Sequence, residues 1–129
     1  MIGKTIKSIL VNNGTLTALV PVTRIFPYVM NEDTVLPAII YSINSVSPEY
    51  NKGGWALDTI SFSVHSFAKD YAALQTVVSA VRGALEWNRT GSGNESIGNI
   101  LLESMDEGYD LTNDVFGNKL TFTVKTNKY

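Results

Sequence analysis

The chain contains no cysteine, a single histidine and little charge. The absence of cysteine excludes disulfide bonds, thiol catalysis and thiolate metal sites. A single histidine leaves too few ligands for a zinc site. Charged residues make up 17% of the chain, against the usual ~25%. The ten basic residues are scattered and the formal net charge is −2, so no basic patch for nucleic acid is predicted.

Long apolar runs and catalytic motifs are also missing. No window approaches 18 consecutive apolar residues, and no apolar segment follows the amino terminus. We therefore expect neither a membrane span nor a signal peptide, and a protein made in the cytoplasm. No G-x-S-x-G, P-loop or EF-hand pattern occurs, although Glu103 to Asp114 is rich in acidic residues. None of the motifs searched for points to a catalytic, metal or phosphate-binding site.

Hydrophobic periodicity predicts two helical segments and a hairpin in the first half. Apolar residues at helical spacing indicate a helix over residues 2–10, followed by a short turn with Thr15 as its N-cap. A short strand over residues 24–28 is expected at a sheet edge because Pro27 lacks an N–H. Longer strands over residues 38–46 and 55–65 are joined by a glycine-bearing loop, which predicts an antiparallel hairpin.

The second half predicts a helix and two strands. An apolar stripe over residues 71–85 indicates a helix whose core positions are Tyr71, Leu74, Val78, Val81 and Leu85. Residues 99–104 and 120–125 read as strands, while residues 106–113 and the Gly117-Asn118 pair read as turns. The fold class is α+β in one domain, residues 1–129: one mainly antiparallel sheet with a long hairpin and two helices packed on one face.

Polar residues alternate with the apolar ones along the predicted strands. Ser61, Ser63, Thr121 and Thr123 are therefore expected on the sheet face that looks away from the helices. His65 shares that face with the two serines. A Ser–His catalytic pair is one interpretation, but strand alternation alone explains the same pattern.

The tip of the hairpin carries the strongest candidate for an interaction site. Tyr50 and Trp55 flank the tip, and exposed aromatics often anchor interfaces. The alternative is that both pack back onto their own domain. With Glu49 and Lys52, they form the predicted interface.

Several ordered stretches resemble the tail completion family found in phage tail-gene clusters. They are Leu16-Thr17-Ala18-Leu19-Val20 with Arg24-Ile25-Phe26-Pro27, then Leu36-Pro37-Ala38-Ile39-Ile40-Tyr41, then the passage from Leu57-Asp58 to Val81-Arg82-Gly83-Ala84-Leu85, and the last alternating strand to Val124. Together they span roughly residues 6–124.

The resemblance implies a non-enzymatic virion protein at the head-proximal end of the tail. Such a protein forms a ring, commonly a hexamer, that caps the tail tube and joins it to the head. The implied partners are copies of itself, the tail tube protein and a head–tail connector protein, with no cofactor, no sequence-specific nucleic acid and no membrane. Three alternatives stay open: another connector or tube role, a small-ligand-binding α+β domain, and an enzyme with a polar cleft around His65.

Overall fold

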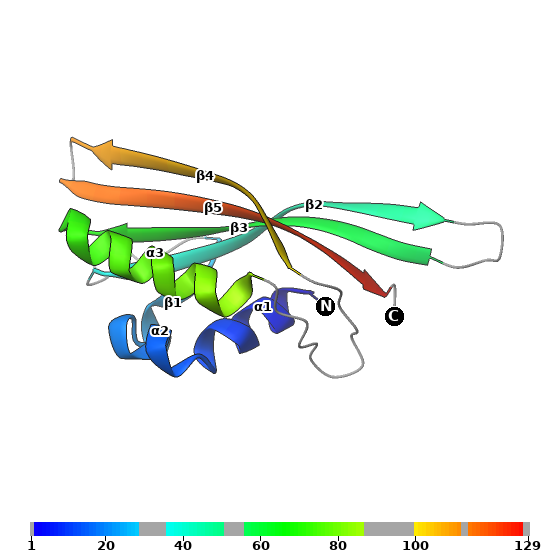
Figure 1. Ribbon diagram of the computed structural model, residues 1–129, viewed down its shortest axis with the longest axis horizontal. Helices are drawn as coiled ribbons and strands as arrows, with labels where there is room; N and C mark the ends of the chain where they lie inside the picture. The colour runs from blue at the N-terminus through cyan, green and yellow to red at the C-terminus, as the bar shows by residue number, and fades with distance from the viewer. Residues whose placement is uncertain (1, 29–35, 51–55, 87–99, 112–113, 128–129) are drawn as a thin grey trace.

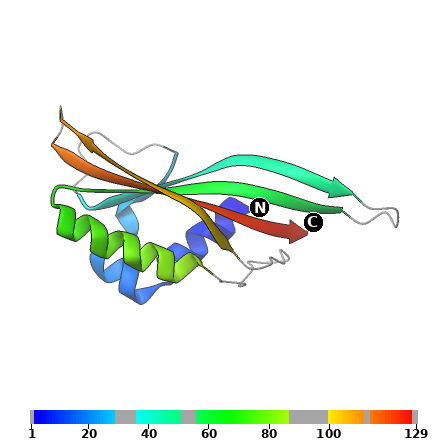
Figure 2. The same ribbon diagram turned by 45° about the horizontal axis from the view of Figure 1, so that its top comes forward.

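A five-stranded sheet with helices on one face forms the framework of the molecule. The computed structural model describes residues 2–28, 36–50, 56–86, 100–111 and 114–127. In chain order the elements are α1 (Ile2–Val11), α2 (Gly14–Leu19), the 3₁₀ turn η1 (Val22–Arg24), β1 (Ile25–Pro27), β2 (Ala38–Tyr50), β3 (Ala56–Ala68), α3 (Tyr71–Leu85), β4 (Leu101–Asp110) and β5 (Val115–Asn127). All three α-helices lie on the same face of the sheet (Figures 1 and 2). The predicted α+β class is confirmed.

The strand order across the sheet is β1-β2-β3-β5-β4. The pairs β2–β3, β3–β5 and β4–β5 are antiparallel, and the short β1 runs parallel to β2 at one edge. The predicted hairpin is confirmed, and each of its strands is 13 residues long. Figure 1 shows this hairpin extending well beyond the helices, so its outer half forms an arm.

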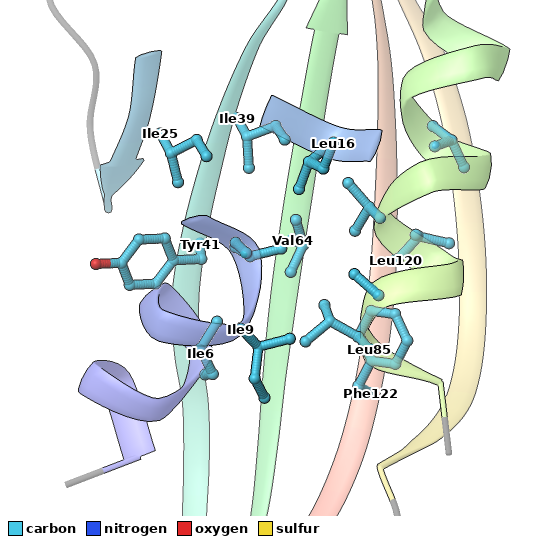
Figure 3. Packing of buried hydrophobic residues seen from close by; sticks show 14 of the residues in the cluster. Ile6, Ile9, Leu16, Ile25, Ile39, Tyr41, Val64, Leu85, Leu120 and Phe122 are labelled. Carbon is cyan, nitrogen blue, oxygen red and sulfur yellow. The ribbon is translucent and has the colours of Figure 1, made fainter. Parts of the chain in front are cut away.

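The core fills the layer between the helices and the sheet. From α3, Leu74, Val81 and Leu85 are almost completely buried, and Leu85 points toward Phe122 on β5 (Figure 3). Phe62 and Phe122 stack across β3 and β5 with ring centroids 5.4 Å apart. Ile6, Ile9 and Leu16 close the other end of this layer from α1 and α2 (Figure 3). The predicted inward face of the second long helix is therefore correct, although Tyr71 at its start is 41% exposed.

The start of α2 is set by an asparagine. Asn13 is the N-cap, and its side-chain oxygen accepts a 2.9 Å hydrogen bond from the backbone N–H of Leu16. This bond satisfies one of the donors that a helix amino terminus leaves open. The predicted cap at Thr15 is wrong by two positions, because Thr15 already lies within the helix.

Two predicted turns are strand in the structure. Residues 106–110 continue β4, which ends at Asp110, and Gly117 and Asn118 lie inside β5. Gly117 pairs with Phe67, and a Cβ at this glycine would lie 3.4 Å from the Phe67 ring. The glycine therefore lies beside the Phe67 side chain within a strand. The 106–110 segment is held as a strand by its ladder to β5.

Candidate assembly surface

The predicted interface at the hairpin tip is only partly described. Glu49 and Tyr50 are the last two residues of β2, where their backbones pair with Leu57 and Ala56 of β3. Lys52 and Trp55 lie outside the described residues. The structure therefore places Glu49 and Tyr50 at the far end of the arm, while the contacts of the four side chains stay a prediction.

The sheet face opposite the helices carries a network of hydroxyl and amide groups. Asn44 sits at a bulge in β2, between Ile43 and Ser45. Its side-chain amide donates a 2.7 Å hydrogen bond to the Ser63 hydroxyl. The Ser63 and Thr121 hydroxyls are 3.4 Å apart. Ser63 lies on the face that no described helix covers, yet it is fully buried, because the neighbouring side chains of the sheet enclose it. The bulge aims a polar side chain across the strands, as bulges commonly do.

His65 lies on this same face, beside an aromatic ring and a lysine. Its ring stacks over Phe67, with centroids 6.3 Å apart, and Lys119 is its partner on β5. Burial and then the Lys119 charge lower the pKa of His65 below its ordinary 6.5. The nearest candidate nucleophile by register, Ser63, is bound to Asn44. Among the described residues, the Ser–His interpretation therefore has no hydrogen bond to support it.

β4 forms an acidic edge of the sheet. It pairs with β5 alone among the described strands, and nearly all of its side chains are exposed. Thr123 of β5 donates a 2.7 Å hydrogen bond to Glu103 at a second bulge. Three apolar side chains of β4 are about half exposed: Leu101 at 44%, Met105 at 51% and Tyr109 at 44%. Sequence patterning missed this edge, because a strand exposed on both faces shows no alternation.

A second edge is open on the arm. β1 pairs only with Ile39, Ile40 and Tyr41 of β2, so the rest of that side of β2 has no neighbour among the described strands. Val46, on the helix side of the sheet by its pairing with Ile60, is 49% exposed. Among the described strands, β4 and the outer part of β2 therefore form two edges that pair with no further strand, and such edges favour pairing with another strand.

An aromatic and acidic cluster braces the end of the sheet where β4 meets β5. Tyr71 donates a 2.9 Å hydrogen bond to Glu107, and Tyr109 donates one to Asp114. Both tyrosine rings contact Phe116. These hydrogen bonds to carboxylates raise the pKa of each phenol above 10.0, so both stay neutral near pH 7. The cluster ties the amino end of α3 to the acidic edge.

The described residues contain no group of three or more His, Asp or Glu side chains placed to hold a metal ion. Within the same parts of the chain, no helix has the length and apolar character needed to cross a membrane.

Comparisons with known proteins give a family match and a shared fold. The family model described as "Tail completion protein gp17" matches residues 4–126. A chain in the solved structure titled "Virion of native gene transfer agent (GTA) particle" has the same fold, with a TM-score of 0.79 at 16% sequence identity. That match covers 95% of this chain and 91% of the other. No match was found among the curated proteins.

Proposed function

Because this chain belongs to the tail completion protein gp17 family and is a phage tail structural protein, we propose that it forms the ring that ends the tail tube. In this proposal, copies of the chain close into a ring, commonly a hexamer, on the head-proximal end of the tube. The ring stops tube growth and presents a surface for the head–tail connector. The observation that carries the proposal is a pair of edges, on opposite sides of one sheet, that pair with no further strand in the described part of the chain.

Two edges on one molecule favour a head-to-tail contact. A contact between unlike surfaces generates a closed ring when the rotation between neighbours closes. The arm supplies reach, because residues 46–50 of β2 extend past Leu101, the first residue of β4 (Figure 1). In the proposal, Tyr50 and Trp55 are the apolar anchors of the arm, and Glu49 and Lys52 lie beside them.

No enzymatic step is part of this function. Burial and then the Lys119 charge lower the pKa of the single histidine, and the nearest serine by register accepts a hydrogen bond from Asn44. We expect no turnover of ester or phosphodiester substrates. Turnover that disappears in a His65→Ala variant would contradict this part of the proposal.

The test is assembly in the presence of the tail tube protein of the same virus. Sedimentation velocity over a concentration series measures ring formation by the chain alone and with preformed tubes. Electron microscopy of tubes grown with and without the chain measures their length. We expect rings at one tube end and shorter tubes. A chain that stays monomeric and leaves tube length unchanged refutes the terminator role, whereas a chain that polymerises into tubes by itself is a tube subunit.

A further inference from the structure

We infer that neighbouring copies join edge to edge, with β4 of one copy forming an antiparallel ladder with residues 42–49 of β2 in the next. This inference rests on the proposed ring and names the surfaces that build it. The occupant of each open edge is a second copy of this chain. Four observations support this: strand direction, strand offset, exposed apolar pairs and charge.

Strand direction permits the contact without any inversion of the subunit. The neighbours β2–β3, β3–β5 and β5–β4 are each antiparallel, so β4 runs opposite to β2. A second copy in the same orientation therefore presents its β2 antiparallel to β4 of the first. The sheet then continues from copy to copy with all subunits pointing the same way, as a cyclic ring requires.

The offset between the two open edges is set by β1. Leu101 pairs with Thr123, Thr123 with Ser61, and Ser61 with Ser45, so Leu101 and Ser45 lie at the same level across the sheet. Because β1 occupies the edge at Ile39–Tyr41, a neighbour in level register is blocked over much of its length. Shifts must be even, since an odd shift would turn every side chain to the opposite face. If β4 is shifted by about four residues along the neighbour's β2, each side chain stays on its own face of the sheet and residues 101–108 no longer meet β1. This is the smallest shift that does both.

This shift matches the geometry of a closed barrel. About four residues correspond to roughly 13 Å along the strands, and the repeat of four strands spans about 19 Å across them. The resulting tilt is about 35°, at the lower end of the 35–45° range in which strands tilt in closed barrels. The position of β1 thus enforces a stagger that a ring of tilted strands needs.

The same shift brings exposed apolar side chains together. Counting from Leu101 opposite Glu49, and skipping the bulged residue Glu103, places Met105 directly opposite Val46. Both side chains lie on the helix side of the sheet, because they pair with Leu120 and Ile60. Each is about half exposed in the single chain, at 51% and 49%. Opposed side chains on one face are the pairs that stabilise a sheet.

Charge favours unlike edges over like ones. β4 carries Glu103, Asp106, Glu107 and Asp110 and no basic residue. Two β4 edges paired about a twofold axis would place these carboxylates against each other, which is destabilising. β2 has no charged residue before Glu49, and its edge presents serine and asparagine side chains. Pro48 has no N–H to donate, so this position offers the ladder only its carbonyl group.

The test uses the absence of native cysteine. Val46→Cys and Met105→Cys proteins are mixed under the conditions of ring formation and oxidised, with Ser79→Cys on the exposed side of α3 as the matched partner for control mixtures. We expect crosslinked dimers only from the Val46→Cys and Met105→Cys mixture. The double variant should give a ladder of products that ends at the closed ring. A second variant, Met105→Lys, should lose ring formation while keeping its melting temperature.

Each outcome separates the inference from the proposed function. Wild-type rings without the Val46–Met105 crosslink refute this edge pairing and leave the terminator role standing. Met105→Cys protein that crosslinks to itself as readily as to Val46→Cys indicates a twofold contact and also refutes the inference. A wild-type chain that stays monomeric on assembled tubes refutes both.

Discussion

Replacing Leu85 with alanine tests the packing of α3 on the sheet. Leu85 is fully buried against Phe122, and the change removes three carbon atoms from the core. The transfer term is about 0.8 kcal/mol per buried carbon. A residual cavity adds to it, so the free energy of unfolding should fall by ~3 kcal/mol, within the range of about 2–5 kcal/mol known for such changes. Val81→Ala removes two carbons and improves helix propensity, so about 1–2 kcal/mol is expected.

The assay is urea denaturation followed by circular dichroism, with Ser79→Ala as the matched exposed control. The control should lie within about 0.5 kcal/mol of the wild type. For a chain of this length, the Leu85→Ala loss corresponds to a melting temperature lower by about 10 °C. The denaturant slope should stay unchanged, since the unfolding transition exposes the same surface. A Leu85→Ala loss no larger than that of the control would refute the described packing of α3.

Three further predictions concern polar groups and the arm. Ser63→Ala should lower the free energy of unfolding by about 1 kcal/mol, because it removes the hydrogen bond from Asn44. Ser66→Ala should be neutral or stabilising, because the buried Ser66 hydroxyl has no partner among the described residues. Equal losses for the two variants in urea denaturation would contradict this contrast. The pKa of His65 is lowered in the folded chain, so the unfolded chain binds the proton first and the free energy of unfolding should fall as the pH drops below 6.5. A His65→Gln variant should show a smaller fall. A histidine pKa above 6.5 in an NMR titration of the folded chain would contradict the predicted sign. Tyr50→Ala and Trp55→Ala should each weaken ring assembly measured by sedimentation, and unchanged assembly in both would remove the arm tip from the interface.

The sequence predicted best the elements that have one buried face. The helix over residues 71–85 and the central strand around Ile60, Phe62 and Val64 lie where periodicity placed them. In each element, one side contacts the core and the other does not, so the spacing of its apolar residues indicates which side is buried. The hairpin followed from these strands and the glycines between them, although both strands extend further than the alternation indicated.

The errors share a physical origin in tertiary contacts. β4 combines acidic residues, Gly108 and exposure on both faces, and nothing local favours a strand there. Its ladder to β5 is a long-range contact whose register a propensity argument cannot supply. Gly117-Asn118 has turn chemistry, yet both residues pair with β3 on one side and β4 on the other. The two open edges were equally hidden, because they depend on the strand order rather than on any single segment.

The one-sided core explains why this sheet suits assembly. The helices cover one face, and the other is closed by hydrogen bonds among Asn44, Ser63 and Thr121. That leaves the edges as the parts of the sheet with unsatisfied bonding capacity among the described strands. Each edge carries a feature that opposes indiscriminate pairing: carboxylates on β4, and Pro48 with β1 on β2. These features disfavour β4 pairing with itself and block level register. The pairing that they leave open joins two different edges, β4 of one copy and β2 of the next, with an offset between them. A closed ring requires a contact of this kind.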